Sequence, residues 1–413
     1  NSCSRITKRK RTVFMAVSVL LLNDSPVKLW ELSSKERLHR QTREMGGLEW
    51  FEDLSDFPAD EPVLLLDGNY LFEIRTFRKL MERPGSILHC AANGQPAAAF
   101  VSAKVAEQAA AYMADPDSAV FPDGVDRLEI TDLPAFDQKL RFARPPLLKH
   151  ITAERQEELE NVLYGNSYRG ITDLVTKFVW PKPARRVVRY CARIGASPNM
   201  ITTLGLILVV AACFLFERKY YFAGLLAGWI MTFLDTVDGK LARVTIQSSK
   251  FGDLYDHGID LFHPPFWYVF WGISLVGMQP VMGFDAYQLC WIVVIAYVAG
   301  RAIEGVFPFL GGPNVWTWTP FDAWFRLIVS RRNPCLIILT VGALIGRPDW
   351  GFIGVVGWMV ICTVILFLRL LQGVFSRMKR GPITSWLSED DVATGPNALS
   401  FRVFGGTKGA YQG

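Results

Sequence analysis

Four aspartates form two pairs with helical spacing. Asp235 and Asp238 are three residues apart, and Asp256 and Asp260 are four residues apart. Side chains with these spacings lie on one face of an α-helix, so two helices joined by a tight loop can direct all four carboxylates to one point. Converging ionised carboxylates repel one another and are costly to bury near a bilayer. The spacing therefore predicts a site that binds cations.

The ligand type indicates which cations and which chemistry to expect. Carboxylate oxygens suit Mg²⁺, and also Mn²⁺ or Ca²⁺, whereas Zn²⁺ prefers His or Cys. A divalent ion in an acidic cage commonly holds a pyrophosphate. Gly239, Ala242 and Gly252 leave room for a nucleotide close to the backbone, and Arg243 can offset phosphate charge. The alternative, a solvated loop between helices, is disfavoured because the aspartates lie within apolar segments.

Long apolar stretches surround the aspartates and begin at Pro198. We expect six membrane-spanning helices, with flanks that complete the ~20 residues a span needs, at residues 201–216, 221–234, 261–278, 286–299, 336–345 and 350–371. Basic residues next to these stretches are typical of the cytoplasmic side; they are Arg185, Arg186, Arg189, Arg331, Arg332, Arg377, Lys379 and Arg380. The sequence predicts a multi-pass protein of a bacterial or archaeal inner (plasma) membrane. Both termini, the soluble domain and the active site then face the cytoplasm.

The composition fits a chain with one soluble and one membrane part. Half of the 413 residues are hydrophobic, yet 20% are charged, and the mean hydropathy is +0.20. The net charge of +5 is mild, so we expect no nucleic-acid partner. The seven cysteines are scattered and form no CxxC pair, which argues against a disulfide framework and a zinc site.

The front of the chain reads as a soluble α/β domain. Apolar strand-like runs at residues 13–22, 62–67 and 87–90 alternate with helical patterns at residues 34–46, 74–81 and 103–113. Such alternation predicts a Rossmann-like domain with a mostly parallel sheet. The first run follows basic residues as in a signal peptide, but no cleavage pattern follows it, so we interpret it as a buried strand.

These features predict four parts. We expect a cytosolic α/β domain over residues 1–150, a linker over 151–197, a membrane domain over 198–375 and a loosely structured cytoplasmic tail over 376–413. Within the linker, residues 184–194 place arginines among apolar side chains, which favours an amphipathic helix in the membrane interface. An ordinary surface helix is the alternative.

The aspartate segment resembles a known enzyme family. Residues 235–260 match the signature D-x2-D-G-x2-A-R-x8-G-x3-D-x3-D of CDP-alcohol phosphotransferases, and Ser197-Pro198-Asn199 with Thr202 resembles the element that precedes their first span. The resemblance covers residues 165–375 or so and implies a six-helix, usually dimeric membrane fold with two bound metal ions, here Mg²⁺ or Mn²⁺. It implies metal binding by Asp235, Asp238 and Asp256, and completion of the cluster by Asp260 as the general base. It also implies a CDP site lined by Asn199, Thr202, Asp235, Gly239, Ala242, Arg243 and Gly252.

A second group of basic residues follows the fourth predicted span. It comprises Arg301, Arg326, Arg331 and Arg332. Arginines directed into a cavity near the metals can bind a phosphate, and phosphatidylinositol-phosphate synthases hold inositol phosphate in a basic pocket of this region. Positive-inside topology or lipid head-group contact is an equally weighted alternative. Glu304 lies one helical turn from Arg301, which predicts an internal ion pair.

The front domain resembles nucleotidyltransferases more weakly, through residues 34–46 and 64–72. Bifunctional inositol-phosphate cytidylyltransferase/di-myo-inositol-phosphate-phosphate synthases join such a domain to a membrane domain of this family. The Gly-rich phosphate loop should follow the first strand, but residues 23–28 contain no glycine. Without the backbone amides of that loop a triphosphate loses its binding nest. We therefore expect a degenerate, inactive domain that regulates, dimerises or docks a separate cytidylyltransferase.

The expected reaction is transfer of a phospho-alcohol group from a CDP-linked alcohol to a hydroxyl acceptor, with release of CMP, in phospholipid or inositol-phosphodiester biosynthesis. The front domain favours a soluble CDP-alcohol as donor. Phosphatidyl transfer from CDP-diacylglycerol to a small polar alcohol such as inositol phosphate is the alternative. A non-enzymatic membrane scaffold and a transporter are further alternatives. The expected partners are these substrates, membrane lipids and a second copy of the chain.

Overall fold

The computed structural model describes residues 17–58, 61–133, 136–137, 142–143, 146–168, 170–388 and 394–405. The chain divides into two compact units, the first over residues 1–135 and 145–159 and the second over residues 136–144 and 160–413. Residues 13–16 of the first predicted strand lie outside the described residues. Each unit is described by itself.

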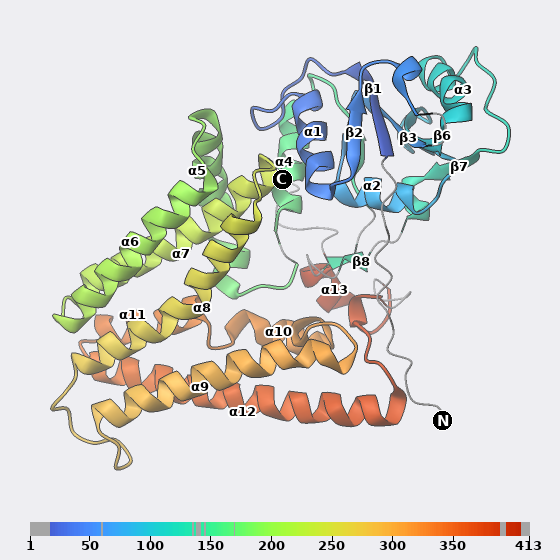
Figure 1. Cartoon of the computed structure of the whole chain (residues 1–413). Helices are drawn as coiled ribbons and strands as arrows, with labels where there is room; N and C mark the ends of the chain where they lie inside the picture. Colours follow the sequence, from blue (N-terminus) through green and yellow to red (C-terminus); the bar gives the residue numbers. More distant parts are fainter. Residues whose placement is uncertain are drawn as a thin grey trace. The chain divides into compact units, whose positions relative to one another are not determined.

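A six-stranded sheet forms the centre of the first unit (Figure 1). Its order is β2 (Leu48–Phe51), β1 (Val17–Asp24), β3 (Pro62–Gly68), β6 (Pro96–Ser102), β5 (Ser86–His89) and β7 (Asp126–Glu129). β1 runs parallel to β2 and β3, and β5 runs parallel to β7, but β6 is antiparallel to both of its neighbours. Five of the six strands therefore run in one direction and only β6 runs against them, so the sheet is mixed but mostly parallel, as predicted. A short antiparallel pair, β4 (Tyr70–Phe72) and β10 (Leu148–His150), lies beside it in the same unit.

Helices cover both faces of this sheet. Successive residues of a strand point to opposite faces, and the buried run of β3 uses both. Leu64 and Leu66 pack with Leu38 of α1 (Ser34–Met45) and Phe77 of α2 (Ile74–Met81). Leu65 packs on the other side, in the core that includes α3 (Ala103–Ala114). The α/β architecture predicted for this part is confirmed.

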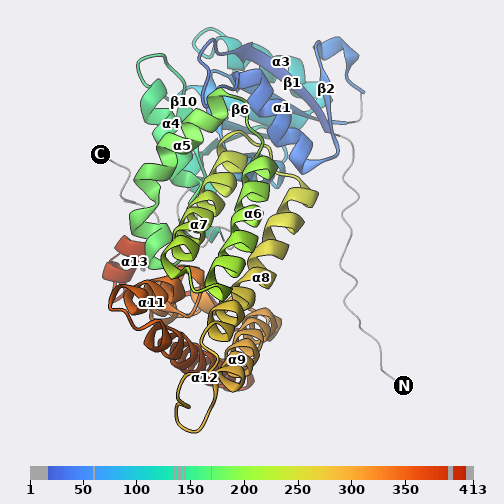
Figure 2. The same ribbon diagram turned by 90° about the vertical axis from the view of Figure 1, so that its left-hand side faces the viewer.

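The second unit is helical. Its longer elements are α5 (Pro181–Arg193), α6 (Pro198–Glu217), α7 (Tyr221–Val244), α8 (Lys250–Ile273), α9 (Ala286–Val306), α10 (Pro320–Ile328), α11 (Arg332–Leu344), α12 (Pro348–Arg380) and α13 (Ala398–Phe404). α4 (Gln156–Asn166) crosses the boundary between the units, and a π-helical turn, η3 (Val175–Val179), precedes α5. α6, α7 and α8 run side by side (Figure 2), α9 packs on α8 and α12, and α11 packs on α7 and α12.

Two tryptophans of α8 pack against α6 and α12. Trp267 and Trp271 are fully buried in a core that also holds Phe216 of α6 and Phe352 of α12. The indole N–H of Trp267 donates to the carbonyl of Val209 at 3.1 Å, and that of Trp271 donates to the carbonyl of Pro348 at 3.0 Å. Buried indoles need such acceptors, so these bonds fix the position of α8 against α6 and α12.

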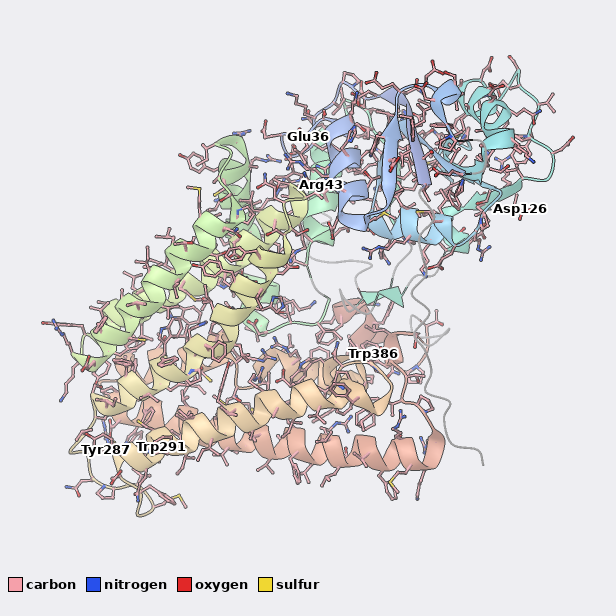
Figure 3. All side chains as sticks on the ribbon, in the orientation of Figure 1. Glu36, Arg43, Asp126, Tyr287, Trp291 and Trp386 are labelled. Atoms are coloured by element: carbon pink, nitrogen blue, oxygen red, sulfur yellow. The ribbon has the colours of Figure 1, made fainter. Side chains whose placement is uncertain are left out.

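Three helices in the described part of the chain are long and apolar enough to cross a membrane: α6, α9 extended to Leu310, and α12. The pair α10 and α11, bent by 42°, adds a fourth if it is one span. The predicted six spans are therefore not confirmed by length and composition. α7 and α8 are 24 residues long each but carry the aspartates, which lower their hydropathy. Figure 3 labels Tyr287 and Trp291 near the start of α9; both are exposed, as expected of aromatic residues at a membrane interface.

The C-terminal segment is more ordered than predicted. α12 continues to Arg380, and Trp386, labelled in Figure 3, is only 2% exposed. Phe404 of α13 is fully buried in the same core as Trp386 and Phe325. The indole N–H of Trp324 donates to the hydroxyl of Ser400 at 3.0 Å. Residues 383–388 and 398–404 therefore pack on the helical unit and are not a loose tail.

Candidate active site

Three of the four aspartates converge. Asp235 on α7 and Asp256 and Asp260 on α8 offer carboxylate oxygens that all lie within 4.8 Å of one another. The turn between the helices is short, and α8 starts at a well-defined cap, because the hydroxyl of Ser249 accepts the N–H of Gly252 at 2.9 Å. The helical spacing read from the sequence thus brings these side chains together.

Asp238 takes a different place in the site. It is buried, and its Oδ2 accepts a hydrogen bond from the hydroxyl of Thr202 at 2.6 Å. Its Oδ1 accepts the backbone N–H of Gly239 at 2.5 Å. Asp238 also interacts electrostatically with Asp235 and Asp256. The fourth predicted carboxylate therefore lies beside the group of three and is bonded to α6.

Arg332 lies on the carboxylates. It is the first residue of α11, and its guanidinium donates to Oδ1 of Asp235 at 3.1 Å and to Oδ2 at 2.6 Å. It also pairs with Asp260. Such a bidentate contact with a carboxylate is among the strongest hydrogen-bonding arrangements of arginine. The sequence predicted Arg332 as a residue of the acceptor site, and the structure places it against the predicted metal ligands.

The donor set fits a divalent cation. The three carboxylates bring three negative charges against one positive charge from Arg332, and each is only partly exposed. The group consists of carboxylate oxygens alone, which Mg²⁺ and Mn²⁺ accept readily. The excess of negative charge would be costly at this degree of burial without a further cation.

Small residues bring the upstream motif close to α8. A Cβ atom on Gly252 would lie 2.9 Å from Oδ1 of Asn199 and 3.0 Å from Oγ of Ser249. A Cβ atom on Gly239 would likewise lie 2.9 Å from a guanidinium nitrogen of Arg243. Gly252 therefore permits the contact between α8 and the start of α6. Ala242, one turn after Asp238, is partly exposed.

Two prolines inside α8 free backbone carbonyls next to the site. Pro265 has no N–H for the carbonyl of Leu261, four residues earlier. The hydroxyl of Tyr297 on α9 donates to that carbonyl at 2.8 Å. This bond holds α9 against α8 one residue beyond Asp260.

The segment before α5 contributes contacts that the sequence did not predict. The buried ammonium of Lys240 donates to the carbonyl of Ser167 at 2.9 Å and lies over the ring of Tyr168. The amide of Asn333, next to Arg332, donates to the buried carboxylate of Asp173 at 2.8 Å. No local pattern marks these pairings, because Lys240 is 73 residues from Ser167 and Asn333 is 160 residues from Asp173.

The remaining predicted arginines lie elsewhere in the helical unit. Arg301 donates to Oε2 of Glu304 at 3.0 Å, and Arg331 pairs with the same carboxylate. The predicted pair of Arg301 and Glu304 is therefore present. Arg326 is buried and lies over the ring of Trp316, 5.5 Å from its centroid. The guanidinium of Arg301 also lies 5.5 Å from the ring centroid of Tyr297.

In the first unit, side chains of the chain accept hydrogen bonds from backbone N–H groups in the first turn of α1. The carboxylate of Asp24 accepts the N–H of Lys35 at 3.1 Å, and the hydroxyl of Ser33 accepts the N–H of Glu36 at 3.1 Å. The loop between β1 and α1 turns tightly at Trp30 and Glu31, both with positive φ, and the Trp30 side chain is buried. These helix-terminal amides are thus already bonded where a phosphate loop would offer free ones.

Part of the helical unit is similar to known proteins. Residues 196–310 match the family model of CDP-alcohol phosphatidyltransferase. Archaetidylinositol phosphate synthase of Pyrococcus horikoshii is 35% identical over 100 residues, which are 24% of this chain and 50% of the relative. Phosphatidylinositol phosphate synthase of Mycobacterium marinum is 29% identical over 207 residues, 49% of this chain and 79% of the relative.

A eukaryotic protein is also similar to part of this chain. Ethanolaminephosphotransferase 1 of Homo sapiens is 31% identical over 121 residues, 25% of this chain and 30% of that protein. The chain thus spans half or less of the length of the archaeal and human relatives. Residues 196–310, which carry the converging aspartates of α7 and α8, therefore match the CDP-alcohol phosphatidyltransferase family model.

Proposed function

We propose that this chain transfers a phospho-alcohol group from a CDP-linked alcohol to a hydroxyl acceptor and releases CMP. The convergence of Asp235, Asp256 and Asp260 within the segment that matches the family carries this proposal. The similarity to synthases and phosphotransferases of this kind supports it.

Divalent cations belong to this proposal. Asp235, Asp256 and Asp260, with Asp238 beside them, would hold two Mg²⁺ ions, and Mn²⁺ is an alternative with the same ligand preference. When bound, the ions would neutralise the pyrophosphate and the departing CMP. The CDP moiety would lie along α6, α7 and α8, against Asn199, Thr202, Gly239, Ala242, Arg243 and Gly252.

Asp260 is the proposed general base. It lies on α8, one helical turn after Asp256, and its side chain is partly exposed. Its carboxylate takes the proton of the acceptor hydroxyl. The acceptor oxygen then forms a bond with the β-phosphorus of the donor, and the bond between that phosphorus and the bridging oxygen breaks, so that CMP leaves. The product is a phosphodiester.

The acceptor side favours a second candidate within the same reaction class. Arg301 and Arg331 share the single carboxylate of Glu304, which leaves one positive charge in excess. Such an excess suits a phosphate on the acceptor. This candidate is phosphatidyl transfer from CDP-diacylglycerol to a phosphorylated polar alcohol such as inositol phosphate, whereas a soluble CDP-alcohol donor remains the first. Arg326 and Arg332 are the other proposed contacts of this side.

The membrane arrangement is part of the proposal. α6, α7, α8, α9, α11 and α12 would form a six-helix membrane domain in the inner membrane of a bacterium or archaeon. Two copies would associate, and the carboxylates would face the cytoplasm. The exposed apolar side chains of α6, α9 and α12 support contact with lipid; among them are Ile207, Phe214, Trp291, Ile295, Val364 and Phe367.

The test supplies purified full-length protein with Mg²⁺ and a panel of labelled CDP-alcohols, lipidic and soluble, each with candidate acceptors. CMP release and the mass of the product identify the pair used. Asp260→Asn should lower CMP release by about 10²–10⁴-fold, the usual share of a general base. Asp253→Asn, on the exposed side of the same helix, is the control and should retain activity. Full CMP release by Asp260→Asn would show that this residue is not the base.

The first unit is proposed to lack nucleotidyl transfer. The bonds that Asp24 and Ser33 make to the first turn of α1 support this view. Incubation of the full chain with CTP and inositol phosphate should yield no CDP-inositol and no pyrophosphate. Formation of either product would contradict an inactive domain.

A further inference from the structure

Arg332 occupies the carboxylates that a metal ion needs. Its guanidinium bonds to both oxygens of Asp235 and pairs with Asp260. The side chain is 15% exposed, so water screens these contacts only in part. A guanidinium and a divalent ion on the same two carboxylates would repel each other strongly at this burial.

The position of Arg332 in the chain would let it move. It is the first residue of α11 and follows directly on the break of 42° between α10 and α11. Its neighbour Asn333 is held independently, because its amide donates to Asp173 at 2.8 Å and to the hydroxyl of Thr176 at 3.2 Å. The backbone at the start of α11 is thus anchored by Asn333, and the Arg332 side chain can change partners without moving the helix.

From these contacts we propose that Arg332 is the resident counter-cation of the metal-free cluster, and that metal binding is an exchange in which its guanidinium leaves Asp235 and Asp260. This inference rests on the proposed metal-dependent transfer. The exchange has two consequences. Metal affinity is lower than the carboxylates alone would give, and the released guanidinium becomes available to a phosphate of the substrate. Metal and anionic substrate then favour each other's binding.

The alternative is that Arg332 only holds α11 against α7 and α8. In that case its removal would loosen the carboxylates and weaken metal binding. The two roles therefore predict changes of opposite sign in the same measurement.

The test measures binding of Mn²⁺ alone to full-length protein in detergent, from the free ion by electron paramagnetic resonance, without substrate. Arg332→Gln should bind Mn²⁺ at least about tenfold more tightly than the wild type, which equals about 1.4 kcal/mol. Arg347→Gln removes the same charge from an exposed pair with Asp349 and is the matched control, with unchanged Mn²⁺ affinity expected. Equal or weaker binding by Arg332→Gln would overturn the exchange.

Thermal unfolding separates loss of affinity from loss of fold. Arg332→Gln should melt below the wild type without metal and regain that difference when Mn²⁺ saturates the site. If Arg332→Gln does not fold, Arg332→Lys replaces it, since an ammonium keeps the charge but cannot bond to both carboxylates as a fork. It should tighten Mn²⁺ binding by a smaller factor, and an unchanged or weaker affinity would overturn the exchange. CMP release by the wild type tests the proposed function separately, because the Mn²⁺ titration contains no substrate.

Discussion

Thr202 donates its hydroxyl hydrogen to Oδ2 of Asp238 over 2.6 Å, and both side chains are buried. The bond joins the start of α6 to the C-terminal half of α7, and so joins the upstream motif to the aspartate signature. A carboxylate that accepts hydrogen bonds at fixed positions is held in one orientation. Thr202 therefore fixes the orientation of the Asp238 carboxylate next to the site.

Replacing Thr202 tests this link. Thr202→Val keeps the shape but removes the donor, which leaves a buried carboxylate oxygen without its partner and should cost about 1–3 kcal/mol of stability. We also expect slower CMP release, since Asp238 loses its orientation. Thr202→Ser keeps the hydroxyl and should retain most of both properties. Thermal unfolding and CMP release of the three proteins check this, and a Thr202→Val protein that matches the wild type in both would contradict it.

Gly252 offers a second test, through close approach rather than hydrogen bonding. An alanine Cβ at this position would come within 2.9 Å of Asn199 and 3.0 Å of the capping Ser249. Gly252→Ala should therefore displace Asn199 or the cap and cost about 1–3 kcal/mol, as overpacking does. If Asn199 contacts the nucleotide, KM for the CDP-alcohol should rise as well.

Gly258 on the same helix is the matched control for stability. A Cβ atom there would meet nothing within 4 Å. Gly258→Ala should be neutral or stabilise the helix by about 0.5–1 kcal/mol. Equal melting temperatures for the Gly252→Ala and Gly258→Ala proteins would show that the close approach at Gly252 does not affect the stability of the fold.

The part of the site that the sequence predicts is the part that depends on local periodicity. Asp256 and Asp260 share a face because a helix repeats every 3.6 residues, and a short turn then brings Asp235 to them. Arg332 is 97 residues from Asp235, and Asn333 is 160 residues from Asp173. No periodic pattern encodes such pairings, which depend on how whole helices pack.

The same difference between local patterns and long-range packing explains which parts of the fold the sequence predicts. Helices at 74–81 and 103–113 follow from amphipathic or alanine-rich patterns and appear as α2 and α3. β6 was missed because its run of three alanines has low strand propensity, and its antiparallel place between β3 and β5 makes it a strand. The segment after Gly381 was read as loose from its polar composition. Nevertheless, its aromatic residues Trp386 and Phe404 are buried against the helical unit.

Phe404 tests whether the C-terminal segment stabilises the helical unit. Its ring is fully buried and meets Trp324 edge to face at 5.1 Å. Phe404→Ala should lower the free energy of unfolding by about 3–5 kcal/mol, the usual cost of deleting a buried aromatic side chain. Leu399→Ala on the same helix is the control, because Leu399 is 66% exposed and should matter little. Similar thermal unfolding of both variants would mean that α13 is dispensable.

Lys177 gives the chain a pH dependence of known sign. Burial lowers the pKa of its ammonium to about 8 in the folded protein, whereas in the unfolded chain the pKa is about 10.4. Between these two pKa values the unfolded chain binds more protons than the folded chain, so the stability that this residue contributes rises with pH from about 8 upward. Below pH 8 the ammonium is protonated in both states, and its contribution to stability does not change with pH. The wild type should therefore gain stability relative to Lys177→Met as pH rises from 8 to 10. Lys177→Arg stays charged throughout this range and should show no such gain. Thermal unfolding in detergent at several pH values checks this, and parallel profiles for the wild type and Lys177→Met would rule out a lowered pKa at this position.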